Sequence, residues 1–398
     1  SNALKYAMPH SRVYVDILQN AEEVKVVFRN ISEQELDYEP ERLTERFVRG
    51  DASRNSEGSG LGLAIAKSIV DYFSNDKNIE LINYRNYKKQ YFEFVGHGKT
   101  VLPAVIWMPE QGIKAVLQIT HGMTEHMGRY ESLAAVLCSH GIAVAGFDLR
   151  GHGKNPGNPE IASFGEGGWA ASIEDMRLFF TELKKRFPGV PHYMLGFSLG
   201  SFLLREYLTN YPNEGELAGA IIAGTGHQSG WLLSVMMAIV KGEFKKAGFD
   251  GTTDLIKQLS FGTYNQKFKP NRTEADWLCN DVNALDDYLV DPLVRKNISA
   301  GLFWELLGSM KRSGNASEYD GWDTSLPILL ISGQDDPVGD GGKGIAYLHK
   351  QMVKAGMEQV TVQLYPNARH DIFHEEASGT AADVRRCIAD WLTAALDG

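Results

Sequence analysis

From about residue 91 to the end of the chain, short apolar runs alternate with segments in which apolar residues recur every three or four positions. The runs are almost wholly apolar, which is typical of strands buried on both faces of a parallel sheet. They are AVLQIT (115–120), IAVAGFDL (142–149), HYMLGF (192–197), AGAIIAG (218–224), ILLIS (328–332) and VTVQLY (360–365). The segments between them predict helices, for example at 131–141, 173–187 and 201–211. This alternation predicts an α/β fold, a mostly parallel sheet with helices on both faces, preceded by a hairpin at 91–95 and 101–109.

One long interval interrupts this alternation. About a hundred residues separate the strand that ends near Gly224 from the strand that begins near Ile328. Because so long an insertion needs structure of its own, we expect a helical cap at about 225–322, over the carboxyl ends of the strands. The apolar segment 231–240 within it has two interpretations. It is either a lid that touches lipid or lines an acyl tunnel, or a buried helix that packs the cap onto the core.

The first 77 residues have a different pattern. RVYVDIL (12–18) and VKVVFRN (24–30) predict two antiparallel strands, and GSGLGLAIAKSIVDYF (58–73) predicts a glycine-rich loop that leads into a helix. We therefore expect a small α+β piece at 1–77 and a larger domain at 78–398. Residues 78–95 suit the end of the first piece as well as the start of the second.

Composition and charge narrow the function classes. The chain has 398 residues, of which 43% are hydrophobic and 23% charged, as in an ordinary globular protein. The net charge of −10 is spread without basic clusters, which argues against a nucleic-acid partner. Three distant cysteines match no metal spacing, so we expect no metal, no cofactor and a reducing compartment. Without a signal-peptide pattern or a run of 18 apolar residues, we expect a cytoplasmic location. The oligomeric state is left open.

The motif that points most directly to chemistry is GFSLG (196–200), which follows a strand pattern and opens a helix pattern. This is the context of a nucleophile elbow, in which glycines two residues before and after the serine permit a tight, strained turn. The turn exposes the hydroxyl of Ser198 at the amino end of the helix. A serine hydroxyl is a weak nucleophile at neutral pH and needs a histidine base that a carboxylate orients.

The expected chain order of these partners is serine, acid, histidine. GQDDPVGD (333–340) and PNARHDIFHE (366–375) each follow a late strand, where loops line the ligand site of an open α/β sheet. We predict Asp336 as the acid and His370 as the base. Asp335 and His374 are the neighbouring alternatives.

Two backbone N–H groups should form an oxyanion hole, where the negative charge of the tetrahedral intermediate develops. We predict that Leu199 supplies one and that Met123, in the loop THGMTEH (120–126), supplies the other. Three histidines in this loop and the next are predicted to hold glycine-containing turns by hydrogen bonds: His121, His126 and His152.

Five motifs in this order resemble the monoacylglycerol lipase and lysophospholipase branch of the α/β-hydrolases. They are HGMTEHMGRYESLA (121–134), FDLRGHGKN (147–155), GFSLGSFLLREYL (196–208), GQDDPVGDGGKG (333–344) and ARHDIFHE (368–375). The resemblance covers about 300 residues and implies the same triad of Ser198, Asp336 and His370. It also implies hydrolysis of a carboxylic ester, with a mobile cap over an apolar acyl pocket. We expect a small-molecule lipid ester to be cleaved through an acyl-serine, and the apolar cap segment 231–240 would allow transient contact with a membrane or micelle. Phe197 departs from the histidine usual in the family, which we expect to affect packing rather than chemistry.

The amino-terminal motifs NALKYAMPHSRVYVDI (2–17) and LTERFVRGDASRNSEGSGLGLAIAKSIV (43–70) resemble the ATP-binding domain of sensor histidine kinases. GSGLGLAIAK (58–67) matches a glycine box, whose amides can bind phosphate at a helix start. The phosphoacceptor histidine helix and most of the asparagine box are absent. The first glycine box reads FRNISEQ (28–34), without its aspartate and glycines. We therefore expect a partial, non-catalytic fragment.

Two other functions stay open at this point. The same triad serves small-ester hydrolases and peptidases, and the glycine box at 58–62 would suit an ATP-binding signalling protein. An epoxide hydrolase or dehalogenase is disfavoured because these enzymes need a carboxylate at the position of Ser198.

Overall fold

The computed structural model describes residues 14–19, 24–29, 87–212, 217–314 and 316–397. The chain divides into two units, Ser1–Asn86 and Tyr87–Gly398, a later division than the 77/78 boundary placed from the sequence. In the first unit, β1 (Tyr14–Gln19) and β2 (Val24–Arg29) pair antiparallel. The predicted glycine-rich loop and helix at 58–73 lie outside the described residues.

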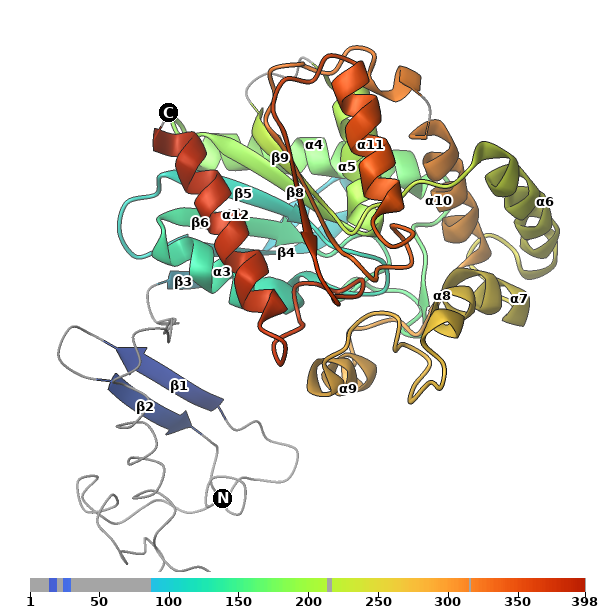
Figure 1. The fold of residues 1–398 in the computed structure, drawn as a ribbon, viewed down its shortest axis with the longest axis horizontal. Coiled ribbons are helices and arrows are strands. Elements are labelled where there is room, and N and C mark those ends of the chain that lie inside the picture. Colours follow the sequence, from blue (N-terminus) through green and yellow to red (C-terminus); the bar gives the residue numbers. More distant parts are fainter. Residues whose placement is uncertain (1–13, 20–23, 30–86, 213–216, 315, 398) are drawn as a thin grey trace, which may run out of the picture. The chain divides into compact units, whose positions relative to one another are not determined.

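The second unit is built on an eight-stranded sheet with the order β12-β11-β9-β8-β5-β6-β4-β3 (Figure 1). Its strands are β3 (Tyr87–Val95), β4 (Val101–Pro109), β5 (Ala115–Thr120), β6 (Ile142–Phe147), β8 (His192–Phe197), β9 (Leu217–Ala223), β11 (Ile328–Gly333) and β12 (Val360–Tyr365). Neighbouring strands are parallel except where β4 pairs antiparallel with β3 and β6. The predicted mostly parallel sheet is confirmed.

Helices cover both faces of this sheet. They are α3 (Glu131–Ser139), α4 (Gly168–Arg186), α5 (Leu199–Asn210), α11 (Lys343–Lys354) and α12 (Thr380–Asp397), with short 3-10 helices at His97–Lys99 and Met127–Tyr130. Successive side chains of a strand point to opposite faces. On β8, the ring of Tyr193 lies 6.0 Å from that of Trp391 in α12, whereas Met194 joins an apolar cluster with Phe179 of α4 and Phe202 of α5. Every residue of the strand is buried, and all but His192 at its start are apolar or aromatic.

Between β9 and β11 the chain folds mainly as helices beside the sheet (Figure 1). They are α6 (Gly230–Ala247), α7 (Asp254–Lys257), a π-helix (Gln258–Gly262), α8 (Thr263–Asn265), a 3-10 helix (Gln266–Phe268), α9 (Val282–Val290), α10 (Ala300–Arg312) and a 3-10 helix (Ala316–Tyr319). Helix α10 packs against α6 and α5. A separate two-stranded sheet pairs β10 (Asn297–Ile298) with β7 (Ile161–Ala162). We call residues 225–322 the cap.

Helix α6, which contains the apolar segment 231–240, has buried apolar residues and exposed apolar residues. Leu233 and Val240 are buried, but Trp231, Val235 and Ile239 are 72%, 49% and 42% exposed. These three residues are four positions apart, so they share one face of the helix. Within the part of the chain that the structure describes, no helix has the length and apolar character needed to cross a membrane.

Candidate active site

Ser198 alone makes the turn between the end of β8 and the start of α5. Its backbone has φ 51° and ψ −117°, a left-handed conformation that is strained for a residue with a side chain. The Ser198 N–H donates to the carbonyl of Ala223 in β9 at 3.0 Å, which holds the turn against the sheet. The serine hydroxyl is thereby set at the amino end of a helix, as the elbow motif predicts.

The two glycines of the motif are required by close backbone contacts. A Cβ on Gly196 would lie 2.3 Å from the carbonyl oxygen of Gly200. A Cβ on Gly200 would lie 2.1 Å from the carbonyl oxygen of Thr120 at the end of β5. Since real Cβ atoms do not approach this closely, only glycine allows the strand and the helix to meet at this angle.

The structure brings together three of the predicted site residues, from loops after β8, β11 and β12. His370 Nε2 lies 2.8 Å from Ser198 Oγ, and His370 Nδ1 lies 2.9 Å from Asp336 Oδ2. The other Asp336 oxygen accepts the N–H of Val338 at 2.8 Å, and Oδ2 also accepts the Ser332 hydroxyl at 3.1 Å. Asp336 is 0% and His370 1% exposed, so the carboxylate and the imidazole are shielded from water.

The charge of Asp336 decides how His370 carries its proton. Burial alone would lower the pKa of His370, but the charge and hydrogen bond of Asp336 raise it above its ordinary value, with help from Asp371 and Glu125. A carboxylate can only accept, so Nδ1 of His370 carries the hydrogen in this pair. In the neutral ring, Nε2 is then free to accept the proton of the Ser198 hydroxyl.

The neighbouring alternatives do not reach Ser198. Asp335 is exposed, and its backbone N–H donates to the carbonyl of Ala368. His374 places Nδ1 2.8 Å from Asp371 Oδ1 and Nε2 2.9 Å from the carbonyl oxygen of Arg129. Of these four side chains, His370 contacts Ser198 and Asp336 contacts His370, the two residues preferred from the sequence.

The backbone around Met123 has side-chain partners on nearly every polar group. The Gly122 N–H donates to Glu125 Oε1 at 2.5 Å, the Gly122 carbonyl contacts His121 Nδ1 at 2.7 Å, and the Met123 carbonyl accepts the Thr124 hydroxyl. No acceptor for the Met123 N–H lies among the described residues, and Met123 lines the pocket at Ser198.

Leu199, the second predicted donor, is the first residue of α5. The N–H groups in the first turn of a helix have no acceptor within that helix. The Leu199 amide therefore lies next to the Ser198 hydroxyl at a helix terminus, a position that favours negative charge.

The loop histidines contact backbone groups. His121 Nε2 accepts the N–H of Leu149 at 2.9 Å, which leaves Nδ1 to donate to the Gly122 carbonyl; burial lowers the pKa of His121 and keeps it neutral. His126 accepts the Gly128 N–H and pairs with Asp291 at 2.9 Å. His152 Nδ1 lies 2.8 Å from the Arg150 carbonyl oxygen, and burial lowers the pKa of His152 to about 3.

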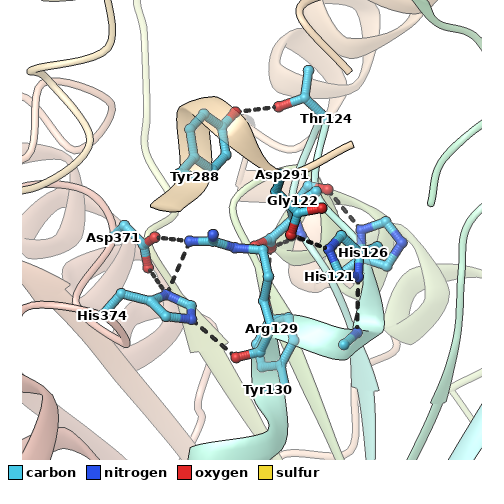
Figure 2. Close-up of polar contacts among 12 residues, drawn as sticks. His121, Gly122, Thr124, His126, Arg129, Tyr130, Tyr288, Asp291, Asp371 and His374 are labelled. Carbon is cyan, nitrogen blue, oxygen red and sulfur yellow. Dashed lines mark hydrogen bonds and ion pairs between the residues drawn. The ribbon is translucent and has the colours of Figure 1, made fainter. Parts of the chain in front are cut away.

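A buried charge network lies behind this loop (Figure 2), and sequence reasoning missed it. Arg129 donates to Glu125 Oε2 at 3.1 Å and to Asp371 Oδ2 at 2.7 Å, which links the Met123 loop to the residue after His370. Burial alone would raise the pKa of Asp371, but His374 and Arg129 hold it well below its usual range. The spacing of Glu125 and Arg129 was visible in the sequence, whereas Asp371 is 242 residues from Arg129.

Aromatic rings enclose the His370 imidazole. Phe197 lies 5.0 Å from it by ring centroids and Trp277 of the cap stacks on it at 5.1 Å. Phe197 also packs against Phe373 at 5.3 Å. The residue that departs from the family pattern thus packs directly against the histidine.

Two cavities meet at this site. The pocket at Ser198 has a volume of about 30 Å³, and a neighbouring chamber within the cap has a volume of about 430 Å³. Both are lined by the same four residues, which separate them: Phe261, Trp277, Leu278 and Tyr288. The residues described by the structure include no cluster of three or more His, Cys, Asp or Glu side chains placed to bind a metal ion.

The amino-terminal resemblance is supported by a family match. Residues 1–110 match the family of histidine kinase-, DNA gyrase B- and HSP90-like ATPases. The probable sensor protein PcoS of Escherichia coli is 34% identical over 82 residues, which are 20% of this chain and 18% of that protein. The family match over residues 1–110 runs past Asn86 into β3 and β4, which the structure pairs within the eight-stranded sheet.

The larger part of the chain matches a different family, and the match covers residues 111–377. Monoacylglycerol lipase of Mycolicibacterium smegmatis is 23% identical over 309 residues, which are 76% of this chain and 96% of that protein. The solved structure of a thermostable carboxyl esterase from Bacillus coagulans has a TM-score of 0.68 and 23% identity, and the alignment covers 77% of this chain and 99% of that one. The chain therefore belongs to the serine aminopeptidase S33 family of α/β-hydrolases.

Proposed function

We propose that this carboxylic ester hydrolase cleaves monoacylglycerols or lysophospholipids through an acyl-Ser198 intermediate. The reaction belongs to residues 78–398, and residues 1–77 take no part in it. The observation that carries the proposal is the pair of hydrogen bonds that joins Ser198 to His370 and His370 to Asp336, beside the amides of Met123 and Leu199. The relatives named monoacylglycerol or monoglyceride lipase support the substrate class.

The geometry suggests the following steps. His370 Nε2 takes the proton of Ser198 as Oγ attacks the ester carbonyl carbon, and Asp336 stabilises the imidazolium that forms. The carbonyl oxygen becomes an oxyanion that accepts hydrogen bonds from the N–H groups of Met123 and Leu199. The intermediate collapses as His370 returns the proton to the leaving alcohol oxygen. Water, deprotonated by His370, then releases the acid from acyl-Ser198.

The larger cavity supports the proposal that the substrate carries a lipid acyl chain. Its volume of about 430 Å³ is in the range of small-molecule sites, and part of its wall is apolar: Phe261, Leu278, Leu289 and Val294. The pocket at Ser198 is too small for an acyl chain, so movement of the shared wall would be needed to join the two cavities.

We expect kcat/KM for p-nitrophenyl esters to rise from the acetate to the octanoate by about a factor of ten or more, because each buried CH₂ contributes about 0.8 kcal/mol. Monoacylglycerol and lysophosphatidylcholine with the same acyl group would be compared by release of fatty acid. Magnesium ATP would be added to one series and should leave the rates unchanged.

Two results would contradict the substrate proposal. A preference for the acetate over all longer esters would favour a small-ester hydrolase. Faster cleavage of aminoacyl p-nitroanilides than of any ester would favour a peptidase with the same triad.

We also propose that the cap contacts lipid aggregates through α6. Trp231, Val235 and Ile239 form its exposed apolar face, and Lys245 in its last turn would favour an anionic surface.

Replacing Trp231 with glutamine should reduce sedimentation with vesicles that contain anionic lipid by at least threefold, because a large apolar group is lost from the contact. The rate on soluble p-nitrophenyl butyrate should stay unchanged, since Trp231 does not line the Ser198 pocket. Val353→Gln, a change at an exposed apolar residue of α11, is the control. Equal sedimentation of wild type and Trp231→Gln would rule out this contact.

A further inference from the structure

The backbone of Thr124 has a strained conformation, and hydrogen bonds of its side chain help to stabilise it. Its φ is 69°, and for a β-branched residue this left-handed region is strained. Its hydroxyl nevertheless has a partner on each side, the Met123 carbonyl and the phenol of Tyr288 in α9 at 2.7 Å (Figure 2). Strained backbone persists where its surroundings determine it, and two hydrogen bonds to one hydroxyl are such a constraint.

These hydrogen bonds have a definite direction. The Thr124 hydroxyl has one hydrogen, which it donates to the Met123 carbonyl, so Tyr288 must donate to Thr124 Oγ1. Burial raises the pKa of Tyr288 to about 12, and the phenol stays protonated at neutral pH. A chain of two hydrogen bonds thus runs from the cap to the peptide that follows Met123.

Two further contacts join the same stretch of the cap to this loop. The Arg295 N–H donates to the Thr124 carbonyl at 2.8 Å, and Asp291 pairs with His126 at 2.9 Å. The guanidinium of Arg129 lies 4.9 Å from the centre of the Tyr288 ring, a cation–π contact that helps to hold the ring in place. Tyr288 also lines both the Ser198 pocket and the large chamber.

We propose that Tyr288 is a positioning residue, which couples the seating of α9 to the orientation of the Met123 amide through the hydroxyl of Thr124. This inference rests on the proposed function, in which that amide binds the oxyanion. When α9 is seated, the peptide after Met123 is held and the amide faces the pocket. When α9 moves away, the support is lost and the oxyanion loses one donor.

The test uses three variants of the full-length protein. Thr124→Val keeps the β-branched shape but lacks the hydroxyl, Tyr288→Phe lacks only the phenol oxygen, and Thr124→Ser restores the hydroxyl. A misplaced oxyanion donor should lower kcat for p-nitrophenyl butyrate about tenfold in the first two, with KM changed less than twofold. The dissociation constant of butylboronic acid, whose tetrahedral adduct on Ser198 resembles the intermediate, should rise by a similar factor. Thr124→Ser should recover kcat to within about threefold of wild type.

The double variant Thr124→Val/Tyr288→Phe should be no slower than the slower single variant, because both changes break the same chain. Tyr211→Phe is the control, since Tyr211 donates to Glu174 at 2.8 Å away from the site. Wild-type rates in Tyr288→Phe, or losses that multiply in the double variant, would overturn this inference. An inactive wild type would instead overturn the proposed function.

Discussion

Replacing Ser198 with alanine is expected to lower kcat for ester cleavage by about 10⁴- to 10⁶-fold, because the proposed reaction has no other nucleophile in place. The loss should come without unfolding. The Ser198 N–H would still bond to Ala223, and alanine is no more strained than serine at this φ. The measurement is kcat on p-nitrophenyl butyrate, together with the thermal unfolding midpoint.

A fluorophosphonate provides an independent readout for the same variant. It should label wild type on the peptide that contains Ser198, as identified by mass spectrometry, and should not label Ser198→Ala. Ser172→Ala is the control, because Ser172 is buried and its hydroxyl donates within α4 to the Gly168 carbonyl. Activity within tenfold of wild type, or label on another serine, would contradict the assignment.

Replacing Asp336 with asparagine should lower kcat by about 10⁴-fold, because an amide can hold His370 in the wrong tautomer. The carboxylate accepts the hydrogen of His370 Nδ1, whereas an asparagine NH₂ group turned toward it would force that hydrogen to Nε2. Nε2 could then no longer accept the Ser198 proton. Asp335→Asn is the matched control, since Asp335 is the adjacent exposed carboxylate and should leave kcat within about twofold.

The pH profile gives this prediction a second readout. Activity requires neutral His370, so kcat/KM should fall as the pH drops through the pKa of His370. Asp336 raises that pKa above its ordinary value, which places the fall at higher pH in wild type. In Asp336→Asn the remaining activity should fall at lower pH. An unshifted profile with a normal kcat, or a larger loss in Asp335→Asn, would contradict the assignment of the acid.

The strands of the hydrolase sheet could be predicted where burial on both faces made them almost wholly apolar. The edge strand β12 is different. VTVQLY was treated like the central strands, but Thr361 and Gln363, which point to the same face of this edge strand, are exposed. Likewise β3 begins at Tyr87, before the predicted start at 91, because its pairing with β4 continues through residues with no apolar pattern.

The elbow could be predicted because its requirements are local. Gly196, Ser198 and Gly200 lie within five residues, and the contacts that demand the glycines are made by the ends of one strand and one helix and by the neighbouring strand. The choice between Asp336 and Asp335 was not local. The two carboxylates share one turn, and the position of His370 distinguishes them.

Sequence by itself determined the family and the α/β architecture and predicted Ser198 as the nucleophile, because strand burial and the glycine elbow leave patterns within a few residues. Tertiary structure decided what surrounds the serine. The contact of Thr124 with Tyr288 joins residues 164 apart, and that of Arg129 with Asp371 joins residues 242 apart. Such pairs leave no periodicity along the chain, since they depend on how the cap and the late loops pack. Folding thus placed Ser198 beside a histidine enclosed by aromatic rings, and Thr124 beside a tyrosine of the cap.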